Sequence, residues 1–233
     1  MNQGNIYRTD IERRIGEGDL RGLLDKAGEL HGHFCNYLTY GVVAGYHGLR
    51  RLGVENTGME ELIAVVETNN CFSDGVQMIT GCSFGNNSLI YRDYGKTAVT
   101  LSRRDGRAVR LALDPGFDDS REREYPEVYA LFGRFVINRE QGSPEDFGRM
   151  MALFAEMSIA ELGVPVERMF LVSEMTLELP EYAPIFDTVK CARCGENVMS
   201  SRVVERDGAH YCIPCAGAPF SELNGAGIRS AAR

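Results

Sequence analysis

The sequence predicts an α+β protein, in which a mixed core of helices and antiparallel sheet is followed by a small zinc-stapled domain. Within the first 179 residues, some segments have apolar residues at helical spacing and others form strand-length apolar runs. Two strand-like runs flank Asp105-Gly106, a turn signal typical of an antiparallel hairpin. Near the end, two Cys-x-x-Cys motifs have the spacing of a four-thiolate metal site.

The first predicted elements are two helices. Apolar residues fall on one face between Asp19 and Leu30, which predicts an amphipathic helix. A His-Gly-His break follows, and Phe34 to Leu52 then predicts a second helix. This helix contains glycines at positions 41, 45 and 48. Their spacing favours close packing of the helix against a neighbour, with ligand contact as the alternative.

The next segments alternate between strands and a short helix. Leu62–Val66 is a continuous apolar run, as expected of a buried strand. Residues 74–80 predict a short helix and residues 88–92 another strand. Residues 97–103 and 107–113 form the predicted hairpin.

Helical patterns return in the second half of the core. Residues 125–138 predict one helix, and residues 144–162 predict another that begins with a Ser143 N-cap followed by Pro144. The charged residues 121–124 are expected to be a solvated helix start. Residues 169–179 predict a last strand. The expected division of the chain is a core at 1–179, a linker at 180–188, a zinc module at 189–216 and a tail at 217–233.

The strongest motif is the pair of cysteine knuckles in the zinc module. The four thiols are those of Cys191, Cys194, Cys212 and Cys215. Zn²⁺ prefers four such ligands in a tetrahedron, and Gly195 permits the tight turn that the first knuckle needs. Val203-Val204 and His210-Tyr211 are expected to be short strands. A structural zinc of treble-clef or ribbon type is therefore predicted; a disulfide pair and an iron–sulfur centre are the alternatives.

Composition limits the compartment and the partners. The chain has seven cysteines, a net charge of −8, no apolar run of bilayer length, and no secretory signal at its start. We therefore expect a reducing cytoplasmic location and no membrane partner. From residue 189 onward, six Lys/Arg against four Asp/Glu leave only +2. Nucleic acid, and with it a transcription-type role for the zinc module, is not expected as a partner.

A second group of potential ligands lies in the first 82 residues. His31, His33 and Cys35 fall within five positions, and Cys71 and Cys82 follow later elements. All five stand at the ends of predicted elements, where side chains can converge on one pocket. A mixed His/Cys set suits zinc, iron or nickel, so a second metal is expected in the core. Because Cys35 begins a helix, we expect a lowered pKa for its thiol.

Other interpretations remain open for some of these residues. Cys82 lies between small residues and fits simple core packing as well as a site. His47, inside a helix, is expected to be a packed or surface histidine. Tyr94 and Lys96, on the bend after a strand, could approach the same pocket, or Lys96 could be a solvated turn residue.

Four segments in a distinctive order carry a family resemblance. They are His31-Gly-His-Phe-Cys35, Ala64-Val-Val-Glu67-Thr-Asn-Asn-Cys71, Gln77-Met-Ile-Thr80-Gly81-Cys82-Ser-Phe-Gly85-Asn-Asn and Leu89-Ile-Tyr-Arg92-Asp93-Tyr94-Gly95-Lys96. Together they resemble the FmdE family of formylmethanofuran dehydrogenase subunits, closely over residues 18–115 and loosely to about 179. The resemblance implies an α+β core, a homodimer, a His/Cys pocket, and a link to a molybdenum- or tungsten-dependent dehydrogenase. The chain departs from the usual pattern at Asn36, where proline is common, and at residues 70–73.

Two functional hypotheses follow. In the first, the core pocket performs metal-dependent or thiol chemistry: Cys71 and Cys35 act as ligands or nucleophiles, His33 ligates or protonates, and Lys96 and Tyr94 stabilise an anionic substrate. In the alternative, the core is a non-catalytic module that binds a metal or small ligand, and the zinc finger docks a partner protein. The sequence leaves open whether the chain is an enzyme and whether it joins dehydrogenase subunits.

Overall fold

The computed structural model describes residues 5–54 and 58–231. The extreme N-terminus, where no secretory signal is expected, and the last two residues of the expected tail lie outside the described part. Contacts divide the chain into two units, Met1–Leu179 and Pro180–Arg233, and each is described by itself. Among the described residues, no helix combines the length and apolar character needed to cross a bilayer.

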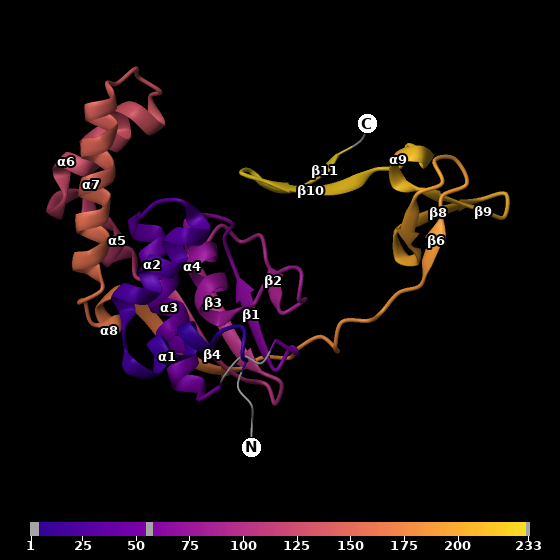
Figure 1. Ribbon diagram of the computed structural model, residues 1–233, viewed down its shortest axis with the longest axis horizontal. Helices are drawn as coiled ribbons and strands as arrows, with labels where there is room; N and C mark the ends of the chain where they lie inside the picture. Colours follow the sequence, from indigo (N-terminus) through magenta and orange to yellow (C-terminus); the bar gives the residue numbers. More distant parts are fainter. Residues whose placement is uncertain (1–4, 55–57, 232–233) are drawn as a thin grey trace. The chain divides into compact units, whose positions relative to one another are not determined.

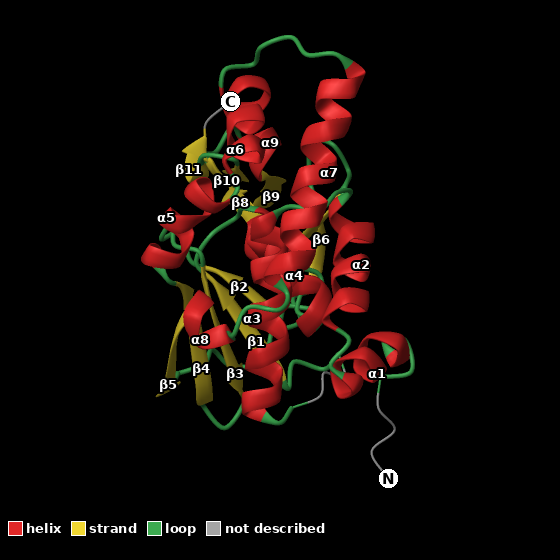
Figure 2. Cartoon of the chain, turned by 90° about the vertical axis from the view of Figure 1, so that its left-hand side faces the viewer, coloured by secondary structure: helices red, strands yellow, loops and turns green. Residues whose placement is uncertain are grey.

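The first unit combines a sheet with helices. Its helices are α1 (Thr9–Glu17), α2 (Leu20–His31), α3 (Asn36–Leu52), α4 (Cys71–Thr80), α5 (Pro115–Glu124), α6 (Pro126–Phe132), the π-helix Gly133–Ile137, α7 (Pro144–Glu161) and α8 (Val166–Met169). Its strands are β1 (Leu62–Val66), β2 (Leu89–Tyr91), β3 (Ala98–Arg103), β4 (Arg107–Leu113) and β5 (Phe170–Thr176). Helices α3 and α4 pack on one face of the sheet (Figure 2).

The sheet has the order β2-β1-β3-β4-β5. Strand β1 pairs parallel with β2, and all other neighbours pair antiparallel, including the predicted hairpin of β3 and β4. Every residue of β1 is buried, as its continuous apolar run predicts. The mixed sheet with helices on one face confirms the α+β class.

Helices α3 and α4 run side by side through close glycine contacts. A Cβ added at Gly41 would lie 2.0 Å from the carbonyl oxygen of Phe72, and one added at Gly75 would lie 2.5 Å from that of Leu38. Farther along, a Cβ at Gly45 would touch Ile79. Both contact positions advance together along the two helices, so α3 and α4 are parallel and their N-termini are adjacent. The predicted packing role of these glycines is confirmed.

Helices α5 to α7 form a layer beside α3 (Figure 1). Residues 121–124 end α5 and do not begin a helix; Glu122, Arg123 and Glu124 are exposed as expected, whereas Arg121 is only 3% exposed. Its guanidinium lies 4.0 Å from the centre of the Phe117 ring and contacts Glu161 of α7 at 3.5 Å. The Tyr40 hydroxyl of α3 also donates to Glu161, at 3.2 Å. This buried polar group ties α3, α5 and α7 together.

The second unit is built from short two-stranded sheets. Its elements are β6 (Thr188–Lys190), β7 (Asn197–Met199), the 3₁₀ turn Ser200–Arg202, β8 (Val203–Arg206), β9 (Ala209–Cys212), α9 (Ile213–Ala216), β10 (Phe220–Asn224) and β11 (Gly227–Ala231). Strands β8 and β9 confirm the two short strands expected between the knuckles. Strands β10 and β11 form a hairpin in the segment expected to be a tail.

The helix contact gives a first prediction. Gly41→Ala should lower the free energy of unfolding by at least about 2 kcal/mol, because the new methyl group meets backbone atoms that cannot rotate away. Urea unfolding followed by far-ultraviolet circular dichroism measures this. Gly148→Ala in α7 is the matched control: nothing lies within 4 Å of the added Cβ, so stability should hold or rise by up to about 1 kcal/mol. Equal effects of the two substitutions would contradict the contact.

The buried carboxyl gives a second prediction. Burial raises the pKa of Glu161 from 4.5 to about 7, against the opposing effect of Arg121. The folded state therefore holds this proton more tightly than the unfolded chain, and stability should fall as pH rises from about 4.5 to about 7. Glu161→Gln should remove on the order of 3 kcal/mol of that pH dependence. Denaturant unfolding across this range, with the exposed Glu156→Gln of the same helix as control, tests it; parallel curves for all three proteins would refute it.

Candidate metal centre

Three of the predicted core ligands come together in the structure. His31 ends α2, Cys35 is the N-cap of α3, and Cys71 is the first residue of α4. One ligand atom of each lies within 4.8 Å of the others. The parallel pairing of α3 and α4 explains the contact of the two cysteines, and the end of α2 supplies the imidazole. Nitrogen and two sulfurs are donor types that transition-metal ions prefer.

The imidazole of His31 is oriented for such a role. Its Nδ1 donates to Oδ2 of Asp74 at 2.8 Å, and this carboxylate lies one turn after Cys71 on α4. Its Nε2 is buried and has no hydrogen-bond partner within the described part of the chain. A carboxylate on one ring nitrogen fixes the tautomer that leaves the other nitrogen free to ligate. Asp74 was missed from sequence, although its spacing of three from Cys71 was a usable signal.

The pKa values of the two thiols shift in opposite directions. The pKa of Cys71 falls to about 6, first because Cys35 donates a hydrogen bond to its sulfur and then because His31 lies nearby. The pKa of Cys35 rises, because of that same bond and because of burial. The expectation of a lowered pKa at Cys35 is therefore wrong. The N–H of Leu38 does donate to the Cys35 sulfur at 3.4 Å, but the neighbouring thiolate has the larger effect.

His33 lies beside the cluster but outside the donor group. Its ring is 4.4 Å from that of His31, tilted by 39°, and it lines the adjoining cavity. Burial, followed by the neighbouring His31, lowers its pKa. A neutral His33 is therefore positioned at the cavity wall, where it can accept or donate one proton.

Three other predicted residues lie elsewhere. Cys82 is fully buried, and its thiol donates to the carbonyl of Leu62 at 3.6 Å, as in the core-packing interpretation. It follows the C-terminus of α4, whereas Cys71 stands at the N-terminus. Tyr94 is 59% exposed, and Lys96 is also exposed. Neither lines the cavity beside the cluster; Lys96 instead lies near Glu67, whose pKa is lowered first by Arg110 and further by Lys96.

A cavity of about 1200 Å³ opens at the cluster. Cys35 and Cys71 lie in its wall together with the first turn of α3. The remaining walls come from α5, α6, the π-helix and α7. Tyr37 connects the two sides, because its hydroxyl donates to Asp118 of α5 at 3.0 Å. The volume exceeds what a typical small ligand needs, so the three donors face a space that can admit one.

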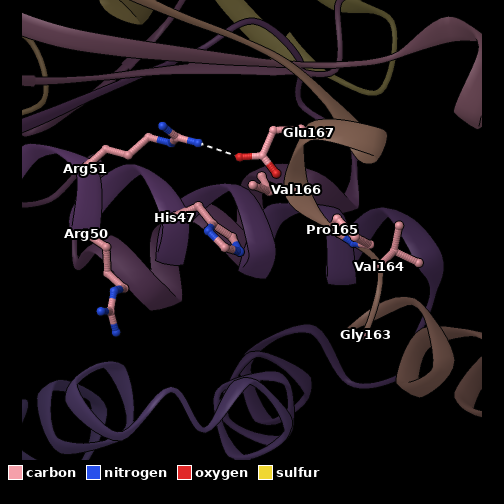
Figure 3. Close-up of a pocket in the computed structure, with 8 residues that line it drawn as sticks. All are labelled: His47, Arg50, Arg51, Gly163, Val164, Pro165, Val166 and Glu167. Carbon is pink, nitrogen blue, oxygen red and sulfur yellow. Dashed lines mark hydrogen bonds and ion pairs between the residues drawn. The ribbon is translucent and has the colours of Figure 1, made fainter.

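A smaller hollow of about 410 Å³ lies between α3 and the segment before α8 (Figure 3). His47 faces it, half-buried, with its ring packed edge-on against Tyr46 at 5.0 Å. Arg51 is paired with Glu167 at 2.8 Å, whereas Arg50 points away and donates to the Tyr46 hydroxyl. These side chains have partners of their own, and His47 is a packed residue as expected.

The four C-terminal cysteines form a second cluster. Their sulfurs lie within 4.8 Å of one another, with those of Cys194 and Cys212 at 4.0 Å. The backbone N–H of Cys212 donates to the Cys191 sulfur at 3.3 Å, and that of Cys215 donates to the Cys212 sulfur at 3.4 Å. Backbone N–H groups lower the pKa of Cys191 to about 6. Four sulfurs at this separation fit a closed tetrahedral zinc site.

Two family profiles match different parts of the chain. The profile of the family described as "FmdE, Molybdenum formylmethanofuran dehydrogenase operon" matches residues 30–171, and the prokaryotic dksA/traR C4-type zinc finger matches residues 184–218. The crystal structure of an FmdE-like protein of tungsten formylmethanofuran dehydrogenase, from Syntrophus aciditrophicus, superposes with a TM-score of 0.54. That comparison covers 85% of this chain and 92% of the other at 20% sequence identity, and so shows a shared fold.

A curated relative from Archaeoglobus fulgidus, named a probable S-adenosyl-L-methionine-binding protein, is 39% identical over 230 residues. The match covers 97% of this chain but only 60% of the relative, so its name describes a longer protein. The zinc-finger match and the cysteine clusters identify a metal-binding protein. Since the first profile covers more than half of its residues, the chain belongs to the FmdE family.

Proposed function

We propose that the core domain binds a transition-metal ion, with zinc as the first candidate and iron or nickel as alternatives. The ligands would be His31 Nε2, Cys35 Sγ and Cys71 Sγ. The observation that carries the proposal is the buried Nε2 of His31, which has no partner in the described part of the chain and lies beside two thiols. Leaving such a nitrogen unpaired is costly, and a metal ion would satisfy it.

The donor count supports a site that is open to ligands. Catalytic zinc sites have three protein ligands and one free position, whereas structural sites have four. Cys35 and Cys71 also line the cavity, so a ligand that enters it can approach the ion. When bound, the metal would polarise such a ligand or lower the pKa of a bound water. His33 at the wall would then supply or accept a proton.

Two features around the ligands support the proposal. Cys35 and Cys71 stand at the N-terminal ends of two parallel helices, where backbone N–H groups favour negative charge. Asp74 holds His31 in the tautomer that leaves Nε2 free to ligate. The backbone N–H groups and Asp74 would contact the ligating side chains and would not bind the metal themselves.

A second candidate is a non-catalytic or thiol function of the same pocket. The lowered pKa of Cys71 beside Cys35 supports a reactive thiol pair in the metal-free protein. Whether the chain acts as a homodimer, with dehydrogenase subunits, or through a zinc finger that docks another protein also belongs to this proposal. The family membership supports those partners without choosing between them.

Metal stoichiometry gives the first test. The full chain, purified after growth with zinc, should contain two metal ions, one in each cluster. Cys35→Ser with Cys71→Ser should leave one ion, because only the C-terminal site remains. Cys82→Ala is the matched control and should retain two, since that thiol bonds a backbone carbonyl. Elemental analysis of the folded proteins measures this; a single ion in the wild type would overturn the core site.

The carboxylate behind His31 gives another test. Asp74→Asn should weaken metal binding at the core site by about 10- to 100-fold, because it removes the charge that orients and polarises the imidazole. Chelator competition on the cobalt-substituted protein measures this through the thiolate charge-transfer absorption. Asp25→Asn on the outer face of α2 is the control, since that exposed carboxylate pairs with Arg21. Unchanged affinity in Asp74→Asn would remove Asp74 from the site.

A further inference from the structure

The wall of the cavity opposite the thiols is acidic. Asp118, Asp119 and Glu122 of α5 line it, and Arg123 of the same helix lies among them. The three acids and one base leave a charge of −2. A divalent ion bound by two thiolates and a neutral imidazole adds no net charge, so the acidic wall sets the charge that an entering ligand meets.

The innermost of these acids forms no ion pair with any residue of the described ranges 5–54 and 58–231. Asp118 is partly buried, and its carboxylate accepts hydrogen bonds from the hydroxyl of Tyr37. Burial, followed by the neighbouring Asp119, raises its pKa against the opposing effects of Tyr37 and Arg121. Arg121, the next cation along the helix, turns away from the cavity to Glu161 and Phe117. A positive group in the cavity would supply the charge that Asp118 lacks.

The Asn36 amide, a neutral polar group of the wall, also favours a ligand that donates hydrogen bonds. The amide nitrogen of Asn36 donates to the hydroxyls of Tyr40 and Tyr129, at 3.4 and 3.2 Å. This fixes the amide so that its oxygen remains as an acceptor, and among the described residues that oxygen has no partner. Asn36 itself lines the cavity. A ligand that brings hydrogen-bond donors therefore suits this wall better than one that brings acceptors.

The rest of the cavity is apolar. Phe132 of α6 and Phe154 of α7 meet edge to face at 5.9 Å, and Met150 and Met151 lie beside them. Aromatic rings attract cations as well as flat apolar groups, and methionine side chains adapt to different shapes. Acidic and aromatic groups together are the usual means of binding an organic cation.

We infer that the ligand of the core site is an organic cation, with an ammonium or guanidinium group held by Asp118 and Glu122 and a ring-bearing apolar body held against Phe132 and Phe154. This deepens the proposed function and rests on it only for a contact between the ligand and the metal. It replaces the anionic substrate expected from sequence, because Lys96 and Tyr94 do not line the cavity.

Three probes with the same ring and different charges test the inference. They are 2-phenylethylamine, 2-phenylethanol and 3-phenylpropionate, titrated into the zinc-loaded full chain and followed by protein chemical shifts. The amine should bind at least about tenfold more tightly than the acid, with the alcohol between them. Shifts should centre on Tyr129, Phe132 and Phe154. Equal binding of amine and acid, or shifts elsewhere on the protein, would overturn the inference.

A matched pair of variants assigns the effect to the wall. Asp118→Asn with Glu122→Gln should reduce the preference for the amine by about fivefold or more. Glu145→Gln with Glu156→Gln, both exposed on α7 and outside the cavity, changes the net charge equally and should leave the preference intact. If both pairs of substitutions lowered the preference for the amine equally, the net charge of the protein would explain it and the site would be refuted.

Repeating the titrations in Cys35→Ser with Cys71→Ser separates this inference from the metal proposal. The probes carry no metal-binding group beyond the charged or hydroxyl end, so the acidic wall should still select the amine. A core site without metal, but with the charge preference intact, would refute the proposed metal function and support the cation site. If the wild type holds both metal ions but does not prefer the amine, the cation site would be refuted and the metal function supported.

Discussion

The close contact of α3 and α4 at Gly41 and Gly75 determines the geometry of the core site. Because neither residue carries a Cβ, the two backbones lie so close that an added Cβ at either position would collide with backbone atoms of the other helix. The helices are parallel, so one contact in their middle also brings their first residues together. Cys35 and Cys71 are thirty-six positions apart in sequence, and the packing of their two helices makes them neighbours. A larger residue at either glycine would separate the helices, and with them the two sulfurs.

The sequence predicted those parts of the sites that depend on local chain geometry. Each C-terminal knuckle places its two sulfurs through one turn, so spacing alone was sufficient. The core residues were expected to share one pocket because they stand at the ends of elements, and the structure brings His31, Cys35 and Cys71 together. This reasoning did not distinguish the two ends of α4: Cys71 begins the helix, and Cys82 follows its end. At 1.5 Å per residue, a helix of this length separates them by roughly 15 Å.

The acidic wall was beyond the reach of sequence reasoning. Tyr37 and Asp118 are 81 positions apart, and residues 115–120 of α5 were not predicted to be helical, because the helix is mostly charged and shows no helical period. Its position depends instead on the buried contacts of Arg121 with Glu161 and Phe117. Lys96 was expected near the pocket because it stands on the bend after a strand. In the structure it lies near Glu67, whose pKa is lowered first by Arg110 and further by Lys96.

The two clusters have different relations to folding. In Pro180–Arg233, the apolar side chains that are buried among the described residues are those of Cys191, Cys212 and Ala216, and two of the three are cysteines of the cluster. Such a unit has too little apolar core to fold alone, so its zinc has a structural reason. The core domain buries a large continuous apolar cluster around α3 and needs no such staple. An incomplete donor set held by rigid helices at the mouth of a cavity costs stability and adds no contact that the fold requires. The proposed function, binding of a metal ion and of a ligand beside it, is the reason that we assign to this cluster.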